Sequence, residues 1–450
     1  MKRMNRDLTS GSIAAGLWAF AIPLMLGNVL QQFYNLVDTW VVGRYIGDHA
    51  LAAVGSSYTL LTFLTSVIIG LSLGTGSFVS IAFGRKDEAS IRNGIFMSSV
   101  LIGTLALVIM GVFYAFLDEI ISFLRVPARL TEDMRIYLVY VFIGFFAAFL
   151  YNYISNVLRG MGNSAVPLCF LALSVMLNVV LDLYFVVVLE MGIRGAAIAT
   201  VIAQYASAIG ILLYFLFACP NCRISKSDMR WDRCNFKSIL SLSGFTCLQQ
   251  SMMNFGILLV QGVVNSFGAA VMAAFAVAVK IDTIAYMPVQ DFGNAFSVFV
   301  AQNYGAKKIE RIRAGVRQAA VSVIGFCILV SMLVCIFARQ LMGIFVDGAN
   351  AETIQIGAEY LHIEGACYIG IGILFLLYGY YRAIDRPFLS VVLTIFSLGT
   401  RVVLANVLSA IPAVGVVGIW VSIPIGWAIA DVFGVWYFCI NKSRRGKIET

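Results

Sequence analysis

The sequence predicts an all-α, polytopic membrane protein that crosses the bilayer twelve times and consists of two pseudo-symmetric bundles of six helices. Its composition is the first reason: of 450 residues, 60% are hydrophobic and only 12% are charged, about half the charged fraction of an ordinary soluble domain. Its apolar residues also form unbroken blocks of roughly 20 residues or more, the length that a helix needs to cross the hydrocarbon core. The strands of a membrane barrel would alternate apolar and polar residues, so these blocks predict helices.

Each helix is expected where an apolar block runs between two polar breaks. In the first half these blocks lie at 13–43, 51–83, 93–117, 133–158, 165–190 and 194–218. In the second half they lie at 238–267, 270–304, 314–338, 354–382, 388–410 and 414–440. A polar linker at 219–237 separates the two sets, so we predict an N-terminal lobe at 1–218 and a C-terminal lobe at 238–450.

The positive charge of the chain predicts its orientation. A net charge of +8 would suggest nucleic acid in a soluble protein, but here the basic residues lie in short loops beside the membrane. If both termini are cytoplasmic, that side holds 23 of the 31 Lys and Arg residues, the opposite loops hold six, and two lie inside spans. Because positive loops stay inside, we expect a multi-pass protein of the cell membrane with both termini in the cytoplasm, lipids around it and no nucleic-acid partner. The first apolar stretch is too long for a cleavable signal peptide.

The two halves resemble each other in their loops. The segment Gly84–Gly94 matches Gly305–Gly315 at an offset of 221 (305 − 84), and Gly192 matches Gly415 at an offset of 223. Chance similarity between two apolar halves is the alternative, but charged residues and glycines that recur in order argue against it. Since each half holds an even number of helices, the repeats are parallel. Two such bundles are the arrangement of a transporter.

Two acids in the first half lie inside predicted spans, where an ionisable group costs about 2.5–3.5 kcal/mol. They are Asp38 in the first helix and Asp182 in the fifth. Asn178 lies four residues before Asp182 and therefore on the same helix face, and Thr200 adds a hydroxyl from the sixth helix. These oxygens suit a hard cation such as Na⁺, and paired carboxylates can also hold a proton. We expect a cation site here and no other metal or cofactor; the alternative is two interfacial acids with separate structural partners.

The corresponding place in the second half is basic. At an offset of 223, Asn178 corresponds to Arg401, whose charge would repel a cation. The seventh helix has no acid within its span, and Glu359 and Glu364 are expected near one end of the tenth. Three charged residues of the eighth helix are expected to balance Arg401 or one another, with substrate contact as the alternative: Lys280, Asp282 and Asp291.

Other side chains of the first half are expected to contact a small-molecule substrate, although plain packing is the alternative. Amides, aromatic rings and thioethers suit varied amphiphilic cations. These candidates are Met25, Gln31, Tyr34, Asn152 and Asn156. Pro23 lies inside the first helix, where it removes a backbone donor and is expected to bend the helix as a hinge.

Three cysteines gather in the linker, and Cys219 and Cys222 have CxxC spacing, with Cys234 beyond them. No histidine lies nearby, so a metal or redox role is the weaker interpretation. The chain has two histidines in all, neither in an HExxH pattern, and no GxxxxGK[ST] phosphate loop. An enzyme or an ATP-driven pump is therefore not expected.

An ordered set of short motifs resembles the multidrug and toxic compound extrusion (MATE) transporters of the oligosaccharidyl-lipid and polysaccharide flippase superfamily. The motifs are Ile22-Pro23, Val37-Asp38-Thr39, Gly84, Leu158-Arg159-Gly160-Met161-Gly162-Asn163, Asn178-x-x-x-Asp182, Gly192-x-x-Gly195-Ala196-Ala197 and Gln302-Asn303-Tyr304-Gly305-Ala306. Each is weak alone, but together they cover nearly the whole chain.

The resemblance implies a secondary antiporter that exports organic, cationic and amphiphilic compounds in exchange for Na⁺ or H⁺. It further implies that Asp38, Asn178, Asp182 and Thr200 form the cation pocket and that the helix bends at Pro23. Relatives that use acids in the seventh and tenth helices are not matched here, which puts a second-lobe cation site in doubt. We expect a monomer. The alternative function is a flippase for lipid-linked precursors, from the same superfamily.

Overall fold

The computed structural model describes residues 7–123, 128–346 and 350–446, and these residues form helices and no strand. Ten of the helices are long and apolar enough to cross a membrane, and two bent helix pairs bring the number of spans to as many as 12. The predicted all-α fold with twelve spans is therefore confirmed. The ends of the predicted lobes, residues 1–6 and 447–450, lie outside the described residues.

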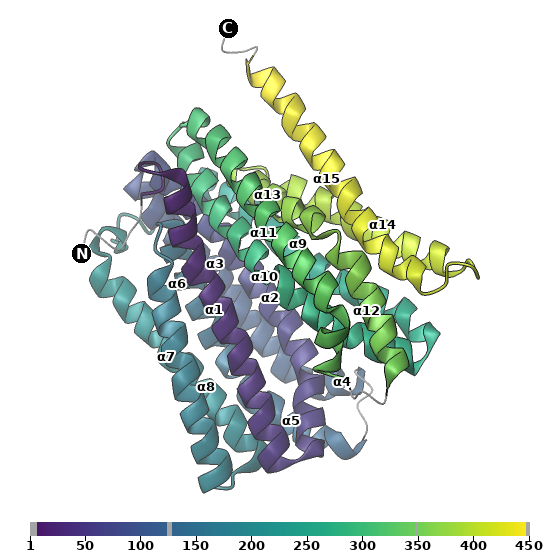
Figure 1. Cartoon of the computed structure of the whole chain (residues 1–450). Coiled ribbons are helices and arrows are strands. Elements are labelled where there is room, and N and C mark those ends of the chain that lie inside the picture. The colour runs from purple at the N-terminus through teal and green to yellow at the C-terminus, as the bar shows by residue number, and fades with distance from the viewer. Residues whose placement is uncertain (1–6, 124–127, 347–349, 447–450) are drawn as a thin grey trace. The chain divides into compact units, whose positions relative to one another are not determined.

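The chain divides into two compact units (Figure 1). The first contains Ala19–Cys247 with the short segments Met1–Thr9 and Gly305–Lys307. The second contains Leu248–Tyr304 and Lys308–Thr450 with the segment Ser10–Trp18. The linker and the first half of the seventh span thus belong to the first unit.

The first unit is a bundle built on α2, α6 and α8. Its elements are α1 (Ile13–Val41), η1 (Val42–Ile46), α2 (Asp48–Arg85), α3 (Glu88–Ala115), α4 (Leu117–Phe123), α5 (Ala128–Val141), α6 (Gly144–Gly160), α7 (Ala165–Asp182), η2 (Leu183–Val188), α8 (Gly192–Ala218) and η3 (Pro220–Cys222). Helix α2 packs against α5 and α6, and α8 packs against α5, α6 and α7. Glycine permits the close approach of α2 and α6, because a Cβ on Gly160 would lie 2.7 Å from the Gly76 carbonyl oxygen.

The second unit has a matching set of helices. They are α9 (Arg233–Val264), which begins in the first unit, η4 (Asn265–Phe267), α10 (Ala269–Gly305), α11 (Ile309–Gly343), α12 (Ala351–Gly365), α13 (Tyr368–Ala383), α14 (Pro387–Ser409) and α15 (Val417–Gly446). Helices α14 and α15 lie side by side (Figure 1), and α11 packs against α12 and α13. The core includes the buried rings of Phe275, Tyr360 and Trp420, with the Phe275 and Trp420 rings stacked at 5.5 Å.

Two spans are broken, which corrects the continuous helices expected at 133–158 and 354–382. The segments Leu130–Val141 and Gly144–Gly160 meet at 44°, and Ala351–Gly365 and Tyr368–Ala383 meet at 53°. At each break a tight i→i+3 hydrogen bond replaces the regular ladder, from Phe145 N to the Phe142 oxygen and from Cys367 N to the Glu364 oxygen. Periodicity could not reveal these bends, because both sides of each break are apolar.

The internal repeat appears in the backbone itself. Positions paired by the sequence offsets share a positive φ, a conformation that most residues avoid. The pairs are Gly47 and Gly268 (114° and 96°), Lys86 and Lys307 (58° and 57°), and Gly192 and Gly415 (59° and 52°). The two halves therefore turn their chains in the same way at matched loops.

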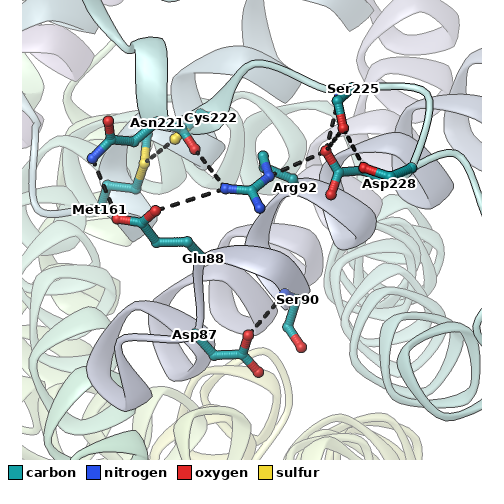
Figure 2. Close-up of polar contacts among 10 residues, drawn as sticks. Asp87, Glu88, Ser90, Arg92, Met161, Asn221, Cys222, Ser225 and Asp228 are labelled. Atoms are coloured by element: carbon teal, nitrogen blue, oxygen red, sulfur yellow. Dashed lines mark hydrogen bonds and ion pairs between the residues drawn. The ribbon is translucent and has the colours of Figure 1, made fainter.

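The linker folds onto the first unit (Figure 2). Arg92 at the start of α3 donates from Nε to Oδ2 of Asp228 at 3.1 Å, and the Asn93 amide donates to the Asp228 and Arg230 carbonyls. The Ser225 hydroxyl and backbone N–H also donate to Asp228 and hold the pKa of its carboxyl below the usual range, with Arg92 adding to the effect. Helix α9 begins at Arg233, so the end of the predicted linker is helical.

Cys222 is the buried cysteine of the linker, and its surroundings disfavour a reactive thiol. The Cys222 thiol is buried against Met161, with 3.3 Å between the sulfurs (Figure 2). Burial raises the pKa of Cys222 to about 12, which suppresses the reactive thiolate. In the described parts of the chain, all nine cysteines are free and no cluster of His, Cys, Asp and Glu could hold a metal ion.

Candidate functional site

The structure gathers the predicted cation-site residues from three helices of the first unit. Asp38 comes from α1, Asn178 and Asp182 from α7, and Thr200 from α8. Their exposed fractions are 9%, 0%, 0% and 4%, so none of the four side chains faces outward. The two carboxylates lie close enough for their charges to interact.

Tyr34, which the sequence predicts to contact substrate, lies in the same cluster. It lies one helical turn before Asp38 and therefore on the same face of α1. Its hydroxyl donates to Oγ1 of Thr200 at 3.3 Å, and it interacts electrostatically with both Asp38 and Asp182. The tyrosine thus ties α1 to α8 beside the carboxylates.

Tyr137 on α5 is a site residue that the sequence did not reveal. It is 7% exposed and interacts with Asp38, Asp182 and Tyr34. A single tyrosine in an apolar block is ordinary in a membrane helix, so its sequence carried no distinguishing signal. Only the packing of α5 against α2 and α8 brings it to the carboxylates.

No residue that the structure describes balances the charge of the two carboxylates. Among the described residues, no Lys or Arg interacts with Asp38 or Asp182. The Asn178 side chain interacts with Asp182, but neither oxygen of Asp182 nor Oδ1 of Asp38 has a hydrogen-bond donor of good geometry among the described residues. Buried charges without partners are costly. The site therefore has the chemistry to take up a cation or a proton.

A π-helical turn follows each carboxylate. The turn η1 begins four residues after Asp38, and η2 begins directly after Asp182. These turns contact each other, and α8 packs against both. Short π-helical segments interrupt the regular hydrogen-bond ladder and occur often at functional sites. They mark the ends of α1 and α7 as places where the backbone departs from a regular helix beside the cluster.

The remaining residues predicted to contact substrate do not join this cluster. Gln31 is exposed, and Met25 is partly exposed. The amides of Asn152 and Asn156 donate within their own helix, to the carbonyls of Ala148 and Asn152. Helix α1 continues through Pro23 as one helix. The substrate and hinge roles of these residues stay predictions.

In the second unit, Arg401 shares its surroundings with two acids. Asp282 interacts with Arg401, Glu364 and Tyr368, and both acids are buried. Lys280 is exposed, and Asp291 is buried. The expected position of Glu364 near one end of a continuous helix was wrong: α12 ends at Gly365, so Glu364 lies at the break inside the span, fully buried.

Comparison with known proteins gives three consistent matches. The sequence matches the family described as MatE over residues 23–184 and again over residues 246–407. It is 29% identical over 397 residues to the probable multidrug resistance protein YpnP of Bacillus subtilis, covering 87% of each chain. It is 26% identical over 445 residues to the probable multidrug resistance protein YoeA of the same bacterium, covering 96% of this chain and 95% of that one.

The fold is also that of a solved structure. A MOP superfamily transporter from Pyrococcus furiosus superposes on the chain with a TM-score of 0.90 at 23% sequence identity, covering 97% of both chains. The two MatE matches begin 223 residues apart (246 − 23), which equals one of the two offsets, 221 and 223, found between the halves of the sequence.

Proposed function

Because the chain belongs to the MatE family of membrane transporters, we propose that it is an antiporter that exports small organic molecules and binds its coupling cation at Asp38 and Asp182. As a member of this family it is a transporter and not an enzyme. Such transporters are driven by ion gradients. The coupling ion is Na⁺ or H⁺, since the same oxygens serve both.

The observation that carries this proposal is the uncompensated pair of buried carboxylates. A neutral asparagine, a threonine and two tyrosines surround the pair, and no described basic residue lies among them. Without a cation the site holds unfavourable like charges. Binding one Na⁺ or H⁺ relieves that repulsion and supplies oxygen ligands to the ion.

Transport then needs a difference in affinity between two conformations. A ligand shifts a conformational equilibrium only by the difference between its affinities for the two states. We propose that the cation favours one state of the first unit and the cargo favours the other, so that each promotes release of the other. When the cation binds or leaves, the charge at Asp38 and Asp182 changes. The π-helical turns beside these residues are the places where the backbone at the ends of α1 and α7 would change conformation in response.

The orientation and the cargo class complete the proposal. The distribution of Lys and Arg supports cytoplasmic termini in the plasma membrane. The names of YpnP and YoeA support drug-like organic cargo. They do not favour the flippase for lipid-linked precursors that the superfamily resemblance left open. For cationic amphiphiles, the half-exposed rings and thioethers of the first unit, such as Tyr34 and Met25, supply suitable contacts.

A vesicle assay tests the proposal. The purified chain is reconstituted, a fluorescent organic cation is added, and Na⁺ and pH gradients are imposed separately. We expect one gradient to drive transport, and Asp38→Asn and Asp182→Asn to abolish it while the protein still inserts and remains folded. Asp118→Asn, which removes an exposed carboxylate on α4, is the matched control and should transport normally. Full gradient-driven transport by both site variants would refute the assignment.

A further inference from the structure

The linker exposes two apolar side chains between the ends of two membrane spans. The spans are Gly192–Ala218 and Arg233–Phe267, and Met229 and Trp231 between them are 52% and 63% exposed. The Trp231 ring packs against the ring of Phe236, with 4.5 Å between their centroids, while most of its own surface stays uncovered. Tryptophan is enriched at the membrane–water interface, which is where a short linker between two spans lies.

The backbone that carries these side chains is held in place by Asn93 of α3. The Asn93 amide donates to the carbonyl oxygens of Asp228 and Arg230 at 2.9 and 2.8 Å. Its own oxygen accepts from the Asn235 amide at 3.0 Å. These three hydrogen bonds hold the chain on both sides of the two apolar side chains. They therefore belong to an ordered surface, which lowers the entropic cost of binding a partner.

The two acids of this segment are occupied by other groups of the protein. The Asp228 carboxylate is buried and accepts from Arg92 and Ser225 (Figure 2). The Asp232 carboxylate caps α9, because its Oδ1 accepts from two backbone N–H groups of the first turn at 2.8 and 3.0 Å. Neither of these described acids forms an ion pair with a basic residue of the linker itself.

Four basic side chains near Trp231 are exposed: Lys226, Arg230, Arg233 and Lys237. None of the four forms an ion pair with an acid in the part of the chain that the structure describes. Arg233 and Lys237 lie four residues apart at the start of α9 and therefore on one face of it. Positive charge at the N-terminus of a helix opposes the helix dipole, so helix stability does not explain this placement.

Membrane topology alone does not explain the arrangement either. The rule that positive loops stay in the cytoplasm would be met by Lys and Arg anywhere in the linker. It requires neither an exposed tryptophan among the basic side chains nor acids that bind other partners. Because both ends of the linker continue into spans, the nearest anionic groups outside the protein are lipid headgroups. Met229, Trp231 and the four basic side chains are called the linker patch below.

We propose that the linker patch binds the anionic headgroups of phospholipids in the adjoining leaflet. Trp231 and Met229 lie at the level of the headgroups, and the basic side chains pair with the phosphates. The bound headgroups also offset the positive charge at the start of α9. That this leaflet is the cytoplasmic one rests on the proposed orientation; that the linker patch binds lipid rests neither on that orientation nor on transport.

Quenching of Trp231 fluorescence by brominated lipids tests the proposal. The full chain is reconstituted in vesicles that contain equal amounts of phosphatidylcholine and phosphatidylglycerol, with bromine on the acyl chains of one lipid or of the other. The chain has six tryptophans, so the signal of Trp231 is the difference between each protein and the same protein carrying Trp231→Phe. We expect brominated phosphatidylglycerol to quench this signal at least about fivefold more strongly, since one cation near an anionic surface contributes about that factor. Equal quenching by the two lipids, or no quenching by either, would overturn the proposal.

The decisive variant is Arg230→Gln with Arg233→Gln. Both side chains are exposed, so folding is retained, and Trp231 should still be quenched. We expect the preference for phosphatidylglycerol to fall at least about fivefold, toward equal quenching by the two lipids. Lys86→Gln with Lys307→Gln is the matched control, because it removes the same charge from exposed loop positions without a neighbouring tryptophan. It should keep the wild-type preference.

Two results with these proteins would contradict the proposal. An equal fall in the arginine variant and in the lysine control would show a general effect of surface charge instead of a linker patch. The second result concerns salt, which at about 1 M shortens the screening length to about 3 Å and should therefore reduce the wild-type preference for phosphatidylglycerol. A preference that is unchanged by salt would show that charge does not hold the headgroups.

Discussion

Neutralising Asp182 is the most direct perturbation of the proposed cation site. Asp182→Asn keeps the size of the side chain and one oxygen but removes its charge. Two unit charges about 4 Å apart at an effective dielectric constant of about 20 attract by about 4 kcal/mol, which corresponds to about a 1000-fold change in affinity. The empty variant also loses the repulsion from Asp38, which offsets part of this term. We therefore expect cation affinity to fall between about 100-fold and about 1000-fold.

Removing Asn178, an uncharged residue of the same site, gives a loss of cation affinity with which the loss in Asp182→Asn can be compared. Asn178→Leu removes a dipole rather than a charge, and a hydrogen-bonding group of this kind contributes about 0.5–1.5 kcal/mol. Its expected loss of affinity is about tenfold or less. If Asp182→Asn weakened binding no more than Asn178→Leu, charge would not be what holds the cation, and the reasoning would fail.

The assay measures both candidate cations on purified protein in detergent. Binding of ²²Na⁺ is followed by scintillation proximity, and proton uptake is followed with an indicator dye as the pH is lowered. Asp282→Asn removes a buried carboxylate of the second unit. It should leave unchanged the binding of the cation whose affinity Asp182→Asn lowers. Because the empty site holds two uncompensated acids, Asp182→Asn should also unfold at the same temperature as wild type or a higher one. Unchanged affinity for both ions, or a clear drop in the unfolding temperature, would count against the site.

Four other changes have defined outcomes. Tyr34→Phe should lower cation affinity by about two- to tenfold, measured as above; a loss as large as that of the carboxylate variants would show that the hydroxyl does more than assist them. Gly160→Ala should cost about 1–3 kcal/mol of stability, seen in thermal unfolding, since its Cβ would meet the Gly76 carbonyl at 2.7 Å; an unchanged midpoint would refute that contact. Pro23→Ala adds a backbone donor and should slow vesicle transport without changing cation binding; unchanged transport would remove the hinge. The pKa of Asp228 is lowered in the folded protein, so its ionised carboxylate stabilises the docked linker fully above about pH 4, the unfolded pKa, and this stabilisation is lost as the pH falls through the folded pKa. Pepsin cleavage of the linker should therefore rise toward low pH in wild type, while Asp228→Asn should be cleaved at every pH tested. A flat wild-type cleavage profile would contradict this role of Asp228.

The scaffold of this protein was readable from local features of its sequence. In a bilayer, an apolar block must satisfy its backbone hydrogen bonds within itself and therefore forms a helix, so the number of spans followed from composition and length. The repeat was equally readable, because residues such as Lys86 and Lys307 mark matched loops and adopt the same backbone conformation.

The acids of the candidate site could also be picked out by sequence, for an energetic reason. A carboxylate in an apolar span is expensive enough to need an explanation, and Asp38 and Asp182 were found on that ground. The same reasoning misplaced Glu364, because it assumed that the tenth span was one straight helix. The break after Gly365 places that acid inside the bundle instead.

Only the tertiary structure determined the contacts that depend on how each helix is rotated and bent. Tyr137 joins the carboxylates, and Tyr368 interacts with Asp282, because of how neighbouring helices face one another. In a span that is apolar on every side, hydropathy carries no period that reports the rotation of the helix. The sequence by itself therefore determined the helices, their repeat and the acids that resist lipid; packing alone determined which uncharged side chains surround the charges.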